Sequence, residues 1–396
     1  MTPSNFPPLS QIPSDRADGH SSWVHRALIF SGLLGRIQPL SLLPAWIALV
    51  AIAGWPWRSL QLPATLVSVF FLAVDWAMLA LLPVRRRSWG PVTPSLLALT
   101  LVRVALLWIG AWLVPTTTGL ALVAAIQALM SAAAIHATWI EPFRLTLTHI
   151  HYHPPHWKEA PPLRVLHISD LHFEGYSPRE HALLAQVARL RPDLILLTGD
   201  YLNLSSVYDP AAQEGARNLL AQLHAPLGVY AVTGSPVVDV EGIVPGIFAD
   251  LDIHWLNDQA VTIHHGDNTI RLLGVRTTYD IDRDTAALKR LTDPATDNAF
   301  TLLLYHTPDL MPVATEAGVH LYLCGHTHGG QIRLPLYGAV ATSSRFGKRY
   351  EMGLYRNGAC TLYVSRGLGM EGLGAPRARF LAPPEIGLWT FKPRSH

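Results

Sequence analysis

Cysteine, charge of either sign and basic stretches are all scarce in this chain. Only two cysteines occur in 396 residues, and both Cys324 and Cys360 lie in apolar runs, which argues against a disulfide framework and favours buried thiols in a reducing compartment. Charged residues make up 15% of the chain, and the formal net charge is +2. Because there is no long basic stripe, we expect no nucleic-acid partner.

Apolar residues are abundant instead, at 49% of the chain, and they are distributed unevenly. Four apolar segments follow one another in the first part of the sequence, each close to the roughly 20 residues that cross a bilayer. Four such runs in succession are rare in soluble chains, so a buried soluble bundle is the weaker alternative. The sequence predicts a transmembrane region over 23–140 that contacts a lipid bilayer, with about four helices at 39–57, 60–83, 94–115 and 118–140.

The flanks of these segments predict an orientation. Residues 1–22 form a polar, Pro- and Ser-rich tail that does not resemble a signal peptide. The loop 84–88, VRRRS, joins the second and third segments, and the positive-inside rule places it in the cytoplasm against the single opposing Arg58. Four spans would then place both chain ends in the cytoplasm. We expect a multi-pass membrane protein whose region after residue 140 lies in the cytoplasm.

Two charged residues fall inside the apolar segments. Asp75 lies 14 residues before Trp89, in the loop between two spans, and Arg103 lies 14 residues after it. Antiparallel helices would therefore bring the two charges to the same depth, where an unpaired charge is costly. We predict an Asp75–Arg103 ion pair that joins the second and third spans. The alternative, part of a proton or ion path, would call for further ionisable groups.

After the last apolar segment the composition changes. Residues 141–160 are polar and rich in proline and histidine, and we interpret them as a linker, with a metal-binding tract as the alternative. From Leu163 onward, continuous apolar strand-like runs alternate with amphipathic helical patterns. This alternation predicts the α/β fold class: a layered α/β domain over 161–396 with central mixed β-sheets flanked by helices.

Polar side chains follow five of the predicted strands directly. Ligands of such sheets bind at the carboxyl ends of the strands, so these side chains are expected to meet. One Asp after a strand is usually a turn residue, and one His is usually a surface group, but so many at the same edge favour a metal site. Carboxylates mixed with imidazoles suit Mn²⁺, Fe or Zn²⁺, and a pair of divalent ions is the device used for phosphoester displacement. The candidate ligands are Asp170, His172, Asp200, Ser235, His306, His326 and His328.

These motifs carry a family resemblance. The segments DLH, GDYLN and GHTHGGQIRLP, with a lone His between the last two, are similar in order and spacing to the calcineurin-like metallophosphoesterases. The tail from RFGKRYEMG to PPEIGLW resembles the bacterial membrane-associated branch, and the likeness covers about 161–392. The resemblance implies that two divalent ions lower the pKa of the attacking water and stabilise charge on the phosphoryl oxygens. It assigns Asp170, His172 and His328 to one ion, His306 and His326 to the other, and Asp200 to both.

The same resemblance suggests residues for catalysis. We expect Asp200 and His326 to act in the reaction and Arg366, within SRGLG, to bind the phosphate group. Other cations that could bind phosphate or a headgroup are Arg333, Arg345, Lys348 and Arg349.

One motif departs from the family pattern. Where the family has Gly-Asn-His followed by an acid, this chain has 233-TGSPVVD-239, so Ser235 replaces the Asn ligand and Pro236 replaces the His. Proline has no side-chain donor, and the loss of one such donor typically slows a reaction about 10²–10³-fold. Three interpretations stay open: a substrate with a good leaving group, a substitute donor such as Asp239 or a nearby His, or a domain that binds metal and phosphate without efficient turnover.

The sequence thus predicts a membrane-anchored, dinuclear metal-dependent phosphoesterase. With the resemblance to the bacterial membrane-associated branch, we expect a multi-pass protein of the bacterial inner (plasma) membrane with a cytoplasmic catalytic domain. The bond that it hydrolyses would be a phosphoester or pyrophosphate bond, and by analogy with the family branch the substrate could be lipid-linked. The alternative is a catalytically impaired module that acts as a membrane-tethered sensor or interaction domain. Residues 264–269 and 276–300 are expected to form a hairpin tip and a surface helix, with a lid as the alternative.

Overall fold

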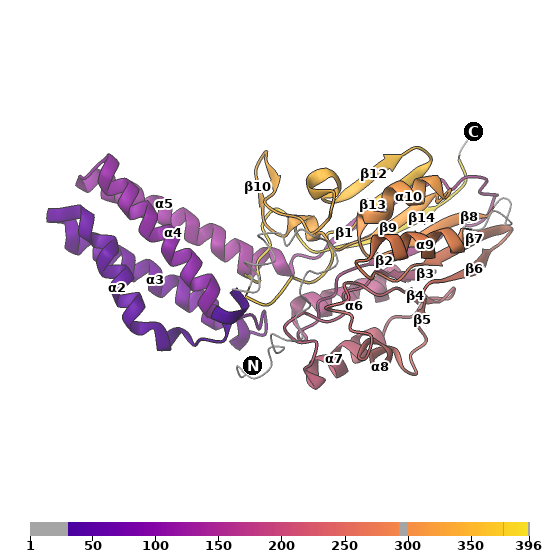
Figure 1. Ribbon diagram of the computed structural model, residues 1–396, viewed down its shortest axis with the longest axis horizontal. Coiled ribbons are helices and arrows are strands. Elements are labelled where there is room, and N and C mark those ends of the chain that lie inside the picture. The colour runs from indigo at the N-terminus through magenta and orange to yellow at the C-terminus, as the bar shows by residue number, and fades with distance from the viewer. Residues whose placement is uncertain (1–30, 293–298, 375, 395–396) are drawn as a thin grey trace. The chain divides into compact units, whose positions relative to one another are not determined.

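The computed structural model describes residues 31–292, 299–374 and 376–394, so the predicted tail 1–22 lies outside the described residues. The chain divides into two compact units (Figure 1). The helix unit comprises the described residues up to Ile140 together with Gly372–Ala378. The sheet unit comprises Glu141–Glu371 and the described residues from Arg379 onward.

Four α-helices make up most of the helix unit. Short 3₁₀ segments, η3 (Pro39–Leu42) and η4 (Trp55–Leu60), flank the first helix, and a π-helical turn, η5 (His136–Ile140), follows the last. The side chain of Thr116 accepts a hydrogen bond from the backbone N–H of Gly119 and so caps the start of the last helix. The helices are α2 (Leu43–Gly54), α3 (Gln61–Val84), α4 (Val92–Leu113) and α5 (Thr117–Ile135).

The count of four membrane-crossing helices stays a prediction. Three stretches in the described chain are long and apolar enough to cross a membrane: Pro39–Val84, Val92–Leu113 and Thr117–Phe143. The first of these contains both α2 and α3. The predicted span 39–57 is α-helical only over α2, about 18 Å at 1.5 Å per residue. The α-helix gives way to the 3₁₀ segment at Trp55-Pro56, since proline supplies no N–H, and the chain then turns at Arg58, where φ is 50°.

The predicted ion pair inside the helix unit is confirmed. Arg103 Nε lies 2.7 Å from Asp75 Oδ2, and Arg103 Nη2 lies 2.7 Å from Asp75 Oδ1, with both residues buried. The same guanidinium donates to the Ser131 hydroxyl at 2.8 Å and to the Gln127 carbonyl at 3.0 Å. The pair joins α3 to α4, and the further bonds extend it to α5.

The sheet unit contains two six-stranded mixed sheets and a two-stranded hairpin. The first sheet has the order β1 (Thr146–Tyr152), β14 (Glu385–Phe391), β2 (Leu163–Ile168), β3 (Leu194–Leu197), β4 (Val229–Ala231) and β5 (His254–Trp255). The second has the order β12 (Gly353–Asn357), β13 (Cys360–Val364), β9 (Leu321–Cys324), β8 (Phe300–Leu304), β7 (Asn268–Gly274) and β6 (Gln259–His265). The hairpin pairs β10 (Arg333–Leu334) with β11 (Gly338–Ala339).

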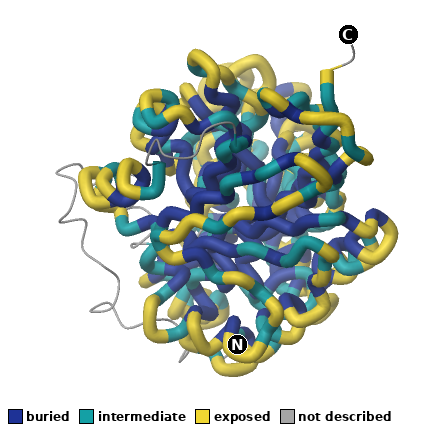
Figure 2. Tube along the Cα trace, turned by 90° about the vertical axis from the view of Figure 1, so that its right-hand side faces the viewer, coloured by how far each residue is buried: buried dark blue, intermediate teal, exposed yellow. Residues whose placement is uncertain are grey.

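Because successive side chains of a strand point to opposite faces, one apolar cluster lies between the two sheets and another covers the outer face of each sheet. Val165 on β2 and Leu302 on β8 belong to an apolar cluster between the two sheets, while the next residue, Leu166, belongs to the outer cluster of the first sheet. The buried strands run through the interior, with exposed loops around them (Figure 2). Helices α6 (Pro178–Leu190), α7 (Pro210–Leu220) and α8 (Val244–Phe248) pack on the first sheet, and α9 (Ile281–Leu291) and α10 (Met311–Glu316) pack on the second.

The expected linker 141–160 is wrong over part of its length. Thr146–Tyr152 forms β1, which pairs in parallel with β14 at the edge of the first sheet. In TLTHIHY, apolar and polar residues alternate, and the strand is partly exposed, so its histidines face outward without conflict. The surrounding prolines and histidines gave the segment the composition of a linker. The sheet unit therefore begins before residue 161.

Neighbouring strands β2, β3 and β4 run parallel, as do β7, β8 and β9. Each set therefore ends on one edge of its sheet. The expected tip at 264–269 is confirmed as the β6–β7 turn, where His265 pairs with Asn268. The expected surface helix within 276–300 corresponds to α9, and residues 293–298 lie outside the described part.

Candidate metal centre

Six of the seven predicted ligands form two groups at the strand ends, and all six are buried except His326, which is half-buried. The loop after β2 supplies Asp170 and His172, the loop after β3 supplies Asp200, β8 leads to His306, and β9 leads to His326 and His328. In each group one donor atom from every residue lies within 4.8 Å of the others. The groups are Asp170, His172 and His328, and Asp200, His306 and His326.

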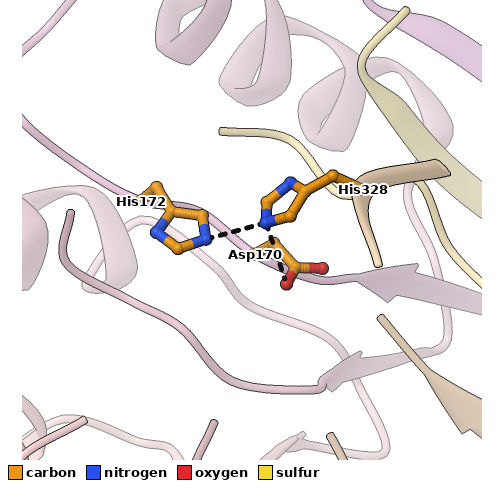
Figure 3. A group of neighbouring side chains, drawn as sticks. All are labelled: Asp170, His172 and His328. Atoms are coloured by element: carbon orange, nitrogen blue, oxygen red, sulfur yellow. Dashed lines mark hydrogen bonds and ion pairs between the residues drawn. The ribbon is translucent and has the colours of Figure 1, made fainter. Parts of the chain in front are cut away.

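The first group is shown in Figure 3, where the two imidazoles and the carboxylate point toward one another. His172 Nε2 lies 3.1 Å from His328 Nε2, and His328 Nε2 lies 3.7 Å from Asp170 Oδ1. All three residues are buried. Two facing imidazole nitrogens beside a carboxylate form a donor set that a cation would satisfy.

Asp200 lies between the two groups. Its Oδ2 is 3.2 Å from His306 Nε2 in the second group and 3.5 Å from His172 Nε2 in the first. His306 Nε2 is in turn 3.1 Å from His326 Nδ1. One carboxylate oxygen thus approaches imidazoles of both groups, which is the position that a shared ligand would need.

The backbone at these residues adopts an uncommon conformation. Positive φ is rare for residues other than glycine and is retained where the surroundings enforce it, often at functional sites. Backbone hydrogen bonds hold these loops, among them Asp170 N–H to the Gly199 carbonyl at 3.0 Å and His172 N–H to the Asp200 carbonyl at 2.9 Å. Five candidate ligands have φ between 40° and 71°: Asp170, His172, Asp200, His326 and His328.

Burial and close charges shift the pKa values in the cluster in opposite directions. Burial opposes protonation of His306, but the charge and hydrogen bond of Asp200 outweigh it and raise the pKa of His306 to about 10. The pKa of Asp200 is lowered in return, because its charged neighbours outweigh its burial. Burial and the charge of His306 lower the pKa of His326 to about 3, and burial also lowers that of His328. His326 and His328 are therefore in the neutral form that binds metal, whereas His306 would release its proton when a metal binds.

The residues present fit two divalent ions. Each group contributes one carboxylate and two imidazoles, the mixed set that suits Mn²⁺, Fe or Zn²⁺ better than Ca²⁺ or Mg²⁺. A cation bound in each group would be coordinated by the carboxylate and imidazole atoms that face one another there. The donor chemistry does not select one metal over the others.

Ser235 stands in the second group, where its sequence position placed it. Its hydroxyl donates to Asp200 Oδ2 at 3.2 Å and lies 3.2 Å from His306 Nε2 and 3.4 Å from His326 Nδ1. Its backbone N–H also donates to Asp200 Oδ1 at 2.6 Å. The hydroxyl therefore lies close enough to join the donor set, although it is shorter than an amide side chain.

Asp239 has a different position from the one a substitute donor would take. Its carboxylate accepts backbone N–H bonds from Asp200, Tyr201 and Gly234 at 2.8, 3.0 and 2.6 Å. It is buried, and burial together with the charge of Asp200 raises its pKa to about 7. Asp239 thus fixes the backbone beneath the cluster and is occupied by that role.

Arg366 does not lie among the donor groups. Its Nε is 2.5 Å from Glu385 Oε2, and its Nη2 donates to the Thr146 hydroxyl at 2.9 Å. Arg333 and Lys348 pair with Glu351, while Arg345 and Arg349 are exposed. A contact between any of these cations and phosphate therefore stays a prediction.

Three further residues at the cluster escaped the sequence interpretation. Glu371 lies near His172 and Asp200, with Oε2 3.9 Å from His172 Nε2. The hydroxyl of Tyr279 interacts with that of Ser235. Buried Arg379 points Nη2 at His328 Nδ1, 3.3 Å away, and binds the carbonyls of Arg366, Gly367 and Gly369. None of the three directly follows a predicted strand, so the rule of polar residues at strand ends could not identify them. Only Glu371 lies in a segment that could have indicated a site, the Gly-rich GLGMEGLG.

Comparison with known proteins agrees with this geometry. The family model for calcineurin-like phosphoesterases matches residues 163–330. The uncharacterized metallophosphoesterase YkuE of Bacillus subtilis strain 168 is 32% identical over 237 residues, covering 58% of this chain and 79% of that protein. The phosphodiesterase YaeI of Escherichia coli K12 is 29% identical, covering 56% and 85%. The UDP-2,3-diacylglucosamine pyrophosphatase LpxG of Chlamydia trachomatis is 26% identical, covering 67% and 95%.

The chain belongs to the calcineurin-like metallophosphoesterase family. This is a family of dimetal-dependent enzymes, and the relatives include a phosphodiesterase and a pyrophosphatase. The layered α/β fold with mixed sheets is the one predicted from the sequence.

Proposed function

We propose that this protein is a membrane-anchored hydrolase of phosphoester or pyrophosphate bonds that works with two divalent ions. One observation carries the proposal: Asp200 Oδ2 lies within 3.5 Å of imidazoles from both Asp/His groups. Asp170, His172 and His328 would hold one ion, His306, His326 and Ser235 the other, and Asp200 both. Bound ions would supply a water of lowered pKa and stabilise charge on the phosphoryl oxygens.

The roles of the protein groups follow from their contacts. Asp239 holds the backbone N–H groups of Asp200 and Gly234 and thereby fixes the direction of the Asp200 carboxylate. Arg379 lies beside His328 and restricts its ring. Such supporting contacts are the ones that keep metal ligands oriented.

The test uses the full chain purified in detergent and loaded with Mn²⁺, Zn²⁺ or Fe²⁺. We expect turnover of bis(4-nitrophenyl) phosphate and about two metal ions per chain. Asp200→Asn should lower kcat by at least about 10³-fold and reduce the metal content. Asp250→Asn is the matched control, because the side chain of Asp250 is 94% exposed; it should leave both quantities unchanged.

A second candidate function rests on Ser235 and Pro236. A cluster that has lost the amide and imidazole of the family motif could bind metal and phosphate without efficient turnover, as a membrane-tethered sensor. Two bound ions together with no turnover by any of the three metal forms would favour this candidate. Ser235→Asn with Pro236→His should then produce activity.

For the substrate we propose a lipid-linked phosphoester or pyrophosphate. The relative LpxG is named for UDP-2,3-diacylglucosamine. Around the β10–β11 hairpin, which follows His328 in the chain, four apolar side chains are 49–109% exposed: Leu334, Leu336, Tyr337 and Val340. Exposed apolar groups beside exposed cations such as Arg345 and Lys348 suit a lipid surface or an acyl chain.

This substrate proposal has its own test. Leu336→Ser should lower kcat/KM for UDP-2,3-diacylglucosamine in mixed micelles several-fold and leave turnover of bis(4-nitrophenyl) phosphate unchanged. Equal effects on both substrates would contradict a lipid-specific role. We further propose that the sheet unit faces the cytoplasm at the bacterial inner membrane; protease digestion of right-side-out spheroplasts should then spare it.

A further inference from the structure

Tyr279 has an unusual position after β7. It is 37% exposed as a residue, yet its hydroxyl interacts with the Ser235 hydroxyl and lies in the field of Asp200. Its ring centroid is 6.3 Å from that of His326. The ring therefore forms part of the rim of the metal centre, with its polar end directed inward.

The backbone at Tyr279 is held in a strained conformation. Its φ is 65°, which is rare for an aromatic residue and usually costs about 1–3 kcal/mol. Both neighbours are fixed: the Thr278 N–H and hydroxyl donate to Asp284, and the Asp280 side chain accepts two N–H bonds at the start of α9. These hydrogen bonds anchor the backbone on both sides of Tyr279.

Four described residues that sequence reasoning offered as donors or phosphate contacts are engaged elsewhere or have no donor. Pro236 has no polar side-chain atom, the Ser235 hydroxyl donates to Asp200, and the Asp239 carboxylate is occupied by three backbone N–H groups. Arg366 pairs with Glu385. A phosphoryl group beside the second Asp/His group would therefore need a donor from another element, and the Tyr279 phenol reaches the same serine from the second sheet.

We propose that Tyr279 is a catalytic residue whose phenol donates a hydrogen bond to a phosphoryl oxygen in the transition state, in place of the side chain that Pro236 cannot supply. The proton stays on the phenol throughout, so no proton transfer is involved. The inference rests on the proposed hydrolase function and names one more residue of that reaction. It also explains how the reaction proceeds without the imidazole of the family motif.

The test is Tyr279→Phe in the full chain in detergent, loaded with Mn²⁺ and assayed with bis(4-nitrophenyl) phosphate. We expect kcat to fall about 10²-fold, the usual loss for one transition-state donor, with KM within about twofold and metal content unchanged. Inhibition by orthovanadate, which mimics the five-coordinate transition state, should weaken far more than inhibition by phosphate. Tyr208→Phe, at an exposed tyrosine on the loop before α7, is the matched control and should behave as the unchanged protein.

Two results would overturn the inference. One is a kcat of Tyr279→Phe within twofold of the unchanged protein. The other is a loss of rate that parallels a loss of bound metal, which would make Tyr279 a support of the ligands. A lack of turnover by the unchanged protein would instead contradict the proposed hydrolase function, so the two failures are distinguishable.

Discussion

Gly325 shows how a single residue limits the metal centre. It joins β9 to His326, and a Cβ there would lie 2.0 Å from Ser169 Oγ and 2.1 Å from Asp170 Oδ2. These distances are too short for any non-bonded contact, so Gly325→Ala should displace Asp170, whose Oδ1 accepts the His326 N–H at 3.0 Å. We expect metal analysis to find at most one ion per chain and kcat to fall at least about 10²-fold.

Gly246→Ala provides the control, because a Cβ at that position has no heavy atom within 4 Å apart from its chain neighbours and the backbone of its own helix. It should retain both ions and full activity. Two ions in Gly325→Ala would mean that the ligand loops can separate without loss, and would contradict the close packing argued here.

His167 makes the stability of the sheet unit depend on pH. It is fully buried on β2 with Nε2 2.8 Å from the Thr198 hydroxyl, and burial lowers its pKa from 6.5 to about 3. The folded state keeps His167 neutral, whereas the unfolded chain protonates this residue below pH 6.5. The resulting contribution to the free energy of unfolding is therefore complete above pH 6.5 and is lost as the pH falls toward 3. At pH 5 the loss is about 2 kcal/mol.

The measurement is the melting temperature of the metal-free full chain between pH 4.5 and 7.5. His167→Gln, which cannot titrate, should be less stable at pH 7.5 but should lose less stability on acidification. The exposed His224→Gln should keep the profile of the unchanged protein. Parallel profiles for all three proteins would contradict the role of His167.

At this scale, sequence predicted the groups that follow strands and missed those that do not. Asp170, Asp200, His306 and His326 were predictable because a buried strand fixes where its next residues lie. Tyr279 was not predictable, since its position depends on how one loop is anchored and on an interaction with Ser235, which follows a strand of the other sheet. For Arg366 the sequence showed a cation near a Gly-rich turn but not its partner Glu385, because the two residues lie at the ends of strands in different sheets.

Among the elements, α3 and α4 are joined by the Asp75–Arg103 pair. Both residues are buried, and two N–O distances are 2.7 Å, so removal of one partner leaves an uncompensated charge. Asp75→Asn should therefore destabilise the helix unit by roughly 3–5 kcal/mol. The melting temperature of the full chain in detergent, with hydrogen exchange of α3 and α4, measures the effect.

The double variant Asp75→Leu with Arg103→Leu is the informative comparison. Paired removal leaves no lone charge, so it should cost far less than Asp75→Asn alone. If the double variant lost as much stability as the single one, the hydrogen bonds of Arg103 to Ser131 and Gln127 would matter more than the ion pair.

Sequence predicted most elements but missed the strand β1, and it did not show where the helix type changes within the first apolar segment. The depth match of Asp75 and Arg103 followed from counting residues along helices, which have a fixed rise. The edge strand β1 was hidden because edge strands are only half buried and because its histidines and the prolines on either side of it are typical of linkers. In the first predicted span, 39–57, hydropathy does not distinguish the 3₁₀ segments Pro39–Leu42 and Trp55–Leu60 from the α-helix between them.

For the whole molecule, metal removal should act on one unit. The two groups of ligands lie entirely within the sheet unit and come from both of its sheets, so bound ions would hold those sheets together at their strand ends. An ion present at 100 times its Kd stabilises the folded state by about 2.7 kcal/mol. Removal with EDTA should therefore lower the melting temperature of the sheet unit by roughly 5–10 °C.

The helix unit supplies the internal control for that experiment, since the buried charges of α3 and α4, Asp75 and Arg103, are paired with each other. Hydrogen exchange during heating should show earlier opening of β2, β3, β8 and β9 after EDTA treatment, with α3 and α4 unchanged. Asp200→Asn should abolish most of the EDTA effect, because the shared ligand is then missing before the chelator is added. An equal shift in both units would mean that EDTA acts on the protein generally, and an unchanged shift in Asp200→Asn would mean that the ions bind elsewhere.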